Sequence, residues 1–270
     1  MKTSTASISI AGVTVLALIV TARAVGTQSG RAIDIGVAGR ANAYASIASS
    51  GSFVGVAWAA RTKDGVTDVY TATSLDGGRT YGSPVRVNQV PGEASVSGEQ
   101  PPRIVLSARA STTPAIVVMW TAKGASGTRL VSARSADGGK SFGAAAAVPG
   151  SDGPGNRGWQ SAAVTPKGDV LAVWLDHREV PARAPAAPGA AHQHVATETR
   201  SAADGVARAQ LSKLFFARLN DPSAARSIAP GVCYCCKTSI ASGPDGTIVA
   251  AWRHVYPGNV RGDIHRRGAP

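Results

Sequence analysis

The chain has few aromatic residues, few cysteines, few carboxylates and, beyond its first residues, no long apolar run. Aromatics make up only 5% of the 270 residues, so a core must be built mainly from Val, Ile, Leu and Ala. The hydrophobic content of 44% is still sufficient for a core, which excludes a disordered chain. The 31 Gly and 16 Pro indicate many turns between short elements, and this favours β-structure.

The shortage of acidic residues leaves a surplus of positive charge. Against 28 Lys and Arg stand 16 Asp and Glu, for a formal net charge of +12, and removal of Lys2 and Arg23 with a leader would leave 12 − 2 = +10. We expect no nucleic-acid partner, because the basic residues are scattered and no nucleic-acid motif accompanies them. The charge favours acidic surfaces or acidic sugars, unless its cause is compositional only.

The first residues form a processing signal. Lys2 precedes an apolar stretch over residues 8–20, and Ala22-Arg23-Ala24 has the small-x-small form of a cleavage site. We predict a signal peptide over residues 1–24, a secreted or periplasmic protein, and no stable membrane anchor after cleavage. The alternative is an uncleaved anchor, although this stretch is short for a bilayer span.

The only cysteines, Cys233, Cys235 and Cys236, lie within four residues, so at least one lacks a partner in this chain. We take all three as disulfide candidates, with Cys233 bonded to either of the others or with a vicinal bond from Cys235 to Cys236. A bridge to a cysteine in a missing C-terminal part, a soft-metal site for an ion such as copper, and a nucleophilic thiol are the alternatives. We expect no metal and no cofactor.

One octapeptide occurs twice. Ser74–Tyr81 reads SLDGGRTY, and Ser135–Phe142 reads SADGGKSF, 61 residues later. In each of these repeat turns the Asp carboxylate can accept backbone N–H groups, the glycines can take φ > 0, and the aromatic residue can close the loop. The positions to which we assign this structural role are Ser74, Asp76, Gly78, Thr80, Ser135, Asp137, Gly139 and Ser141.

Strand-like runs surround the repeat turns at regular intervals, and several central runs end in Trp. The expected strands are 44–48, 53–58, 68–73 and 84–88; 103–107, 115–120, 129–134 and 144–148; 159–164, 170–174 and 211–218; 238–242 and 247–252. Four antiparallel strands in about 60 residues are typical of a propeller blade. We therefore predict an all-β fold with a lead-in over 25–41 and a partial β-propeller over 42–264, of about three and a half blades.

The repeat turns match the Asp-box, or bacterial neuraminidase repeat, and the chain resembles the sialidase superfamily of six-bladed propellers. The resemblance implies an exo-α-sialidase type of glycoside hydrolase acting on exported or host glycans, with an acidic sugar as the bound group. Such enzymes use three Arg, an Asp acid/base and a Tyr nucleophile assisted by Glu. The alternatives are a non-catalytic glycan- or protein-binding propeller and an inactive fragment.

The chain departs from that family at two places. Pro102-Arg103-Ile104 only partly matches the family's Phe-Arg-Ile-Pro motif, so no role is transferred to Arg103. The family's Tyr and later Arg belong to blades beyond those found here, and Tyr256 does not match the nucleophile position. We interpret the tail 265–270 as truncated or frame-shifted.

Strand order predicts which end of the blades carries function. If the repeat turns join strands three and four, the loops between strands two and three and the blade-to-blade connections lie at the opposite end. From these loops we select Asp176 as acid/base and Arg178, Arg253 and Arg261 as substrate ligands. The alternatives are solvated loop charges and a structural ion pair between Asp176 and Arg178. We interpret the insertion 179–209, with His192 and His194, as a disordered linker in preference to a metal-binding loop.

Overall fold

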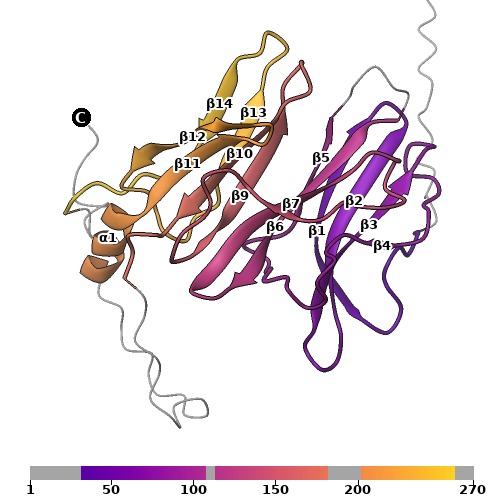
Figure 1. The fold of residues 1–270 in the computed structure, drawn as a ribbon, viewed down its shortest axis with the longest axis horizontal. Helices are drawn as coiled ribbons and strands as arrows, with labels where there is room; N and C mark the ends of the chain where they lie inside the picture. The colour runs from indigo at the N-terminus through magenta and orange to yellow at the C-terminus, as the bar shows by residue number, and fades with distance from the viewer. Residues whose placement is uncertain (1–31, 108–112, 182–201, 259–270) are drawn as a thin grey trace, which may run out of the picture. The chain divides into compact units, whose positions relative to one another are not determined.

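The computed structural model describes residues 32–107, 113–181 and 202–258, and nearly every element in it is a β-strand (Figure 1). The predicted all-β propeller fold is confirmed. The first sheet contains β1 (Ala41–Ser50), β2 (Phe53–Arg61), β3 (Thr67–Ser74) and β4 (Val85–Arg86). The second contains β5 (Arg103–Ser107), β6 (Ala115–Gly124), β7 (Gly127–Ser135) and β8 (Ala146–Ala147). The third contains β9 (Arg157–Val164), β10 (Val170–Asp176), β11 (Lys213–Arg218) and β12 (Asp221–Pro230), and a two-stranded sheet pairs β13 (Ser239–Ser242) with β14 (Ile248–Ala251).

Each four-stranded sheet is an antiparallel meander, in which every strand pairs with the next strand along the chain. The second strands β2, β6 and β10 are buried almost throughout, and each has a paired strand on both sides. β6 and β10 lie between neighbouring sheets, whereas β2 faces the second sheet on one side and packs against Ile35 and Val37 of the lead-in on the other. Their sequences are accordingly runs of Val, Ala and Trp rather than alternating polar and apolar residues. The first strands β1, β5, β9 and β13 contact one another in succession, as the inner strands of propeller blades do.

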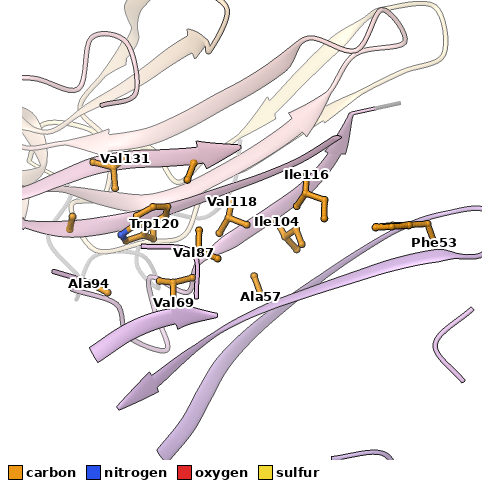
Figure 2. Close-up of a cluster of buried hydrophobic side chains, with 12 residues drawn as sticks. Phe53, Ala57, Val69, Val87, Ala94, Ile104, Ile116, Val118, Trp120 and Val131 are labelled. Carbon is orange, nitrogen blue, oxygen red and sulfur yellow. The ribbon is translucent and has the colours of Figure 1, made fainter. Parts of the chain in front are cut away.

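Apolar side chains fill the space between successive sheets. Figure 2 shows the largest cluster, in which Phe53, Ala57 and Val69 of the first sheet face the second sheet. On the opposite side lie Ile104, Ile116, Val118, Trp120 and Val131. Trp120 has no exposed surface, and a buried indole ring removes a large apolar area from water.

The repeat turns have the internal hydrogen bonds that their sequence suggests. Asp76 Oδ1 accepts from the backbone N–H groups of Arg79 and Thr80, both at 2.9 Å, and Thr80 Oγ1 donates to Asp76 Oδ2 at 2.7 Å. Asp137 makes the equivalent bonds with Lys140 and Ser141. Side-chain hydrogen bonds from the neighbouring hydroxyl groups lower the pKa of both aspartates, so the turns remain bonded at any ordinary pH.

Hydrogen bonds also show which loops share an end of the sheets. Gly77 N, in the first repeat turn, donates to Ser52 O in the β1–β2 turn at 2.8 Å. At the other end, Gly155 N of the connection between the second and third blades donates to Ser126 O of the β6–β7 turn at 3.1 Å. The two sets of loops therefore separate as the strand order predicts.

One part of the predicted linker is a helix. α1 (Ala202–Leu211) occupies the end of the insertion expected as a loop up to Ala209, and it delays the start of β11 to Lys213. Alanine is the strongest helix former, and Asp204 in the first turn and Arg208 in the last turn suit the helix dipole. His192 and His194 lie outside the described residues. Among the residues that the structure does describe, no helix is long and apolar enough to cross a membrane.

Candidate functional site

A pocket of about 580 Å³ lies at the end of the second and third blades that is remote from the repeat turns. Its walls are the β6–β7 turn, the blade connection at residues 154–156, the segment 177–181 that follows β10, and Arg208 of α1. We call this cavity the blade pocket. It lies where strand order predicted functional loops, and its polar lining comes from Asn156, His177, Arg178, Glu179 and Arg208.

Strand register sets the charges beneath the blade pocket. Asp176 is the last residue of β10, where it is the direct cross-strand partner of Arg157 on β9 and of Lys213 on β11. Its carboxylate is buried and lies between two arginines: Arg157 Nε is 3.3 Å from Oδ2, and Arg178 Nη2 is 2.8 Å from the same oxygen. Arg178 Nε and the Arg178 backbone N–H also donate to Oδ1, at 2.8 and 3.0 Å.

These contacts decide the protonation of Asp176. Burial raises its pKa, but the hydrogen bonds from Arg178 and the positive charge of Arg157 outweigh burial, and the pKa is lowered overall. Asp176 is thus a carboxylate at neutral pH, with partners on both oxygens. This environment suits a group that holds other residues in place, whereas a general acid must carry a proton at the working pH. The predicted catalytic role of Asp176 stays a prediction.

Arg157 connects this charge cluster to the wall of the blade pocket. Its guanidinium is wholly buried and donates to the backbone oxygens of Asp152 and Gly155, both at 2.9 Å, and to that of Pro154. The wall segment 154–156 is therefore tied to Asp176 through a single side chain. Burial lowers the pKa of Arg157, and the adjacent Asp176 charge opposes this shift.

His177 lies at the inner side of the blade pocket among aromatic rings. Its ring centroid is 5.2 Å from that of Trp159 and 6.5 Å from that of Tyr234. Burial lowers the pKa of His177 to about 4, so the imidazole is neutral at neutral pH. Its Nε2 atom has no hydrogen-bond partner among the described residues, which leaves one buried polar atom available to a ligand.

The outer side of the blade pocket carries two further charged groups. Arg208 stands over the Tyr234 ring, with Cζ 5.7 Å from the centroid, and donates to Pro181 O at 3.4 Å. Glu179 pairs with Lys213, the neighbour of Asp176 across the strands. Within the described part of the chain, the Arg208 guanidinium forms no salt bridge, so this half-buried side chain is the cation of the pocket lining best placed for an incoming anion.

The structure brings together only some of the residues selected from the sequence. Asp176 and Arg178 are in direct contact, whereas Arg253 lies beside the cysteine turn, with Nη1 4.0 Å from Cys236 Sγ. In that turn Cys233 and Cys236 are joined by a disulfide and Cys235 is free and exposed. Arg261 falls outside the described residues.

Sequence reasoning missed Arg157, Arg208 and Glu179. Arg157 could have been found from its position. It is the first residue of an inner strand, directly after a blade-to-blade connection, and these connections were expected to lie at the functional end of the blades. No comparable signal marked Arg208, since the segment that carries it was interpreted as a linker.

The fold and the pocket together define this chain as a β-propeller protein with a polar cavity at one end of its blades. No protein-family model matches the sequence, and no curated protein does. Among solved structures, the chain is similar to the Hadza microbial sialidase Hz136 at 13% identity and a TM-score of 0.45, over 79% of this chain and 42% of that one. The α-L-arabinofuranosidase Arb93A from Fusarium graminearum matches at 14% identity and a TM-score of 0.44, over 82% and 59%.

A third solved structure is the intramolecular trans-sialidase from Ruminococcus gnavus, at 12% identity and a TM-score of 0.37, over 75% of this chain and 37% of that one. The chain spans 42%, 59% and 37% of the lengths of these three solved structures, respectively. Its assignment to the propeller class rests on its own blade topology.

Proposed function

We propose that this chain is a sialidase-like glycoside hydrolase and that its blade pocket binds the acidic sugar at the end of a glycan. The hydrolase type is what the repeat turns imply through their resemblance to the Asp-box. The pocket supplies the second support, because it is large enough for a monosaccharide and combines polar groups with exposed apolar walls.

The charge of the blade pocket carries the proposal. The cations on or beneath it outnumber the carboxylates by one: Arg157, Arg178, Arg208 and Lys213 against Asp152, Asp176 and Glu179. Most of these charges are neutralised in ion pairs, and the unpaired positive charge of the Arg208 guanidinium remains on the wall of the blade pocket. A planar guanidinium pairs with a carboxylate through two parallel hydrogen bonds, so Arg208 suits the carboxylate of an acidic sugar.

A binding measurement tests the acidic-sugar part. The purified chain is titrated with N-acetylneuraminic acid and, as the matched ligand, with its methyl ester, which lacks only the charge. Charged hydrogen bonds contribute about 1.5–3 kcal/mol, so we expect the acid to bind about tenfold to a hundredfold more tightly than the ester. Equal affinity for the two would contradict the proposal.

Two arginine variants locate the site. We expect Arg208→Gln to abolish the preference for the acid, since the substitution removes the cation of the wall. Arg134→Gln is the matched control, because Arg134 is exposed near the far end of β7 and should leave both affinities unchanged. A loss of the same size in both variants would mean that the overall charge of the chain, and not the blade pocket, selects the anion.

A second candidate function is glycan binding without catalysis, and the environment of Asp176 favours it. The carboxylate is enclosed by Arg157 and Arg178 and carries no proton to donate at neutral pH. Hydrolysis of a fluorogenic sialoside distinguishes the two functions. Turnover that disappears in a folded Asp176→Asn variant supports the hydrolase with Asp176 in its reaction. Binding of the acid with no turnover by the unaltered chain supports the non-catalytic propeller.

A further inference from the structure

The connection between β12 and β13 gathers all three cysteine sulfurs of the chain in one turn. Cys236 N donates to Cys233 O at 3.4 Å, and Cys233 N donates to Arg253 O at 2.9 Å, which anchors the turn to the segment after β14. Cys235 Sγ lies 3.9 Å from Cys233 Sγ, and the three sulfurs all lie within 4.8 Å of one another. We call residues 233–236 the cysteine turn.

We propose that the cysteine turn, once its disulfide is reduced, binds one Cu(I) ion through the sulfurs of Cys233, Cys235 and Cys236. A metal–thiolate bond of about 2.3 Å separates the sulfurs of a trigonal site by about 4 Å. The 3.9 Å between Cys233 and Cys235 already has this value. The Cys233–Cys236 pair has to move apart, and both belong to a turn with a single backbone hydrogen bond between them.

The ligand set selects the metal. Thiolates are soft ligands that prefer Cu(I), Zn(II) and iron–sulfur clusters, and structural zinc sites are almost always tetrahedral with four ligands. Among the described residues, the ligand group at this turn contains three cysteines and no His, Asp or Glu to serve as a fourth ligand. A three-coordinate site of this composition suits Cu(I) better than Zn(II).

The charges and the exposure of the turn fit a bound thiolate cluster. Three thiolates and one Cu(I) carry a net charge of −2, and the Arg253 guanidinium lies 4.0 Å from Cys236 Sγ, where it stabilises negative charge on that sulfur. Cys235 is exposed and gives the ion access from solvent, whereas Cys233 is buried and protects the metal from one side.

The disulfide makes binding dependent on redox state. An external dithiol transfers two electrons and two protons to the Cys233–Cys236 bond, which breaks to give two thiols while the dithiol becomes a disulfide. Cu(I) then replaces the thiol protons at the three sulfurs, and copper stays in the +1 state throughout. The oxidised turn offers only the Cys235 thiol, which is not sufficient for a three-coordinate ion.

The test measures Cu(I) uptake by the full chain under argon, after reduction with dithiothreitol and its removal. The probe is the coloured Cu(I)–bicinchoninate complex, whose colour falls as the protein takes the ion. We expect the reduced chain to remove one equivalent and the oxidised chain to remove none. Equal uptake by the two forms, or none by the reduced form, would overturn the proposal.

Cys235→Ser tests the third ligand without touching the disulfide pair. Loss of groups that only support a ligand already costs tenfold to a hundredfold in metal affinity, so we expect at least about a tenfold loss here. Tyr234→Phe is the control in the same turn and should bind as the unaltered chain does. Unchanged affinity in Cys235→Ser, or displacement of Cu(I) by an equimolar amount of Zn(II), would refute the three-thiolate Cu(I) site.

Discussion

Replacing Asp176 with Asn should strongly destabilise the fold, because it leaves a buried guanidinium without its counter-charge. The variant keeps the size of the side chain and removes only its charge. Arg178 is about one-third exposed and can be hydrated, but the Arg157 side chain has no exposed surface. Breaking a buried ion pair by removing one partner typically costs about 3–5 kcal/mol, and we expect a loss in this range.

Urea denaturation followed by circular dichroism measures this loss. The slope of the unfolding free energy against urea concentration should be unchanged, which would indicate that the variant and the unaltered chain have the same unfolded state. Asp169→Asn is the matched control. Asp169 pairs with Arg218 at 3.1 Å, but both side chains are partly exposed, so its loss should cost less than about 1 kcal/mol. A loss below about 1 kcal/mol for Asp176→Asn would refute the inference that Asp176 neutralises Arg157.

The stability difference between the unaltered chain and Asp176→Asn should also depend on pH. The pKa of Asp176 is lowered in the folded state, so its stabilisation is fully present above the pKa of the unfolded state and is lost as the pH falls through the folded pKa. The stability difference between the unaltered chain and Asp176→Asn should therefore be constant near neutral pH and shrink in acid. A difference that grows in acid would contradict this sign.

Three further predictions concern the core, the buried histidine and the pocket wall. Trp120→Ala should cost about 3–5 kcal/mol in urea denaturation, while Trp252→Ala, at a residue that is 40% exposed, should cost far less; similar losses would contradict the packing in Figure 2. The His177 imidazole should titrate near its pKa of about 4 by NMR. The ordinary pKa of 6.5 in the unfolded chain lies 2.5 pH units higher, so about 3 kcal/mol of stability should be lost as the pH falls from 6.5 through 4. Titration near 6.5 would show that His177 is solvated. Gly155→Ala should distort the pocket wall and lower the melting temperature, because a Cβ there would lie 2.6 Å from His177 O. Gly246→Ala is the control, since Gly246 has a similar φ of +83° but open space around it, so this variant shows the effect of backbone strain alone. Equal effects of the two substitutions would show that the contact with His177 is unimportant.

Several features of the fold follow from short stretches of sequence. The strand β5 begins and ends at the predicted residues 103–107, and the other predicted strands overlap those observed. Strand periodicity and turn chemistry act over a few residues, so both are readable without the rest of the chain. α1 was missed because its alanines lie in a Pro-containing insertion, where composition favoured a linker over helix propensity.

The site was predictable in its place but not in its partners. Strand order placed functional loops at one end of the blades, and the blade pocket lies there. The sequence also offered Asp176 and Arg178 as neighbours two residues apart. It gave no indication that Asp176 would face a second arginine, because Arg157 is 19 residues earlier and meets it only through the β9–β10 register.

The sequence by itself determined the repeated four-strand unit, the hydrogen-bonded repeat turns and the separation of the two sets of loops. Each depends on residues that lie close together in the chain. Only the tertiary structure decided which charges are neutralised, that His177 is buried among rings, and that Arg208 of α1 meets the loop after β10. These properties depend on burial and on distances between segments remote in the sequence, and electrostatic interactions change in strength with both.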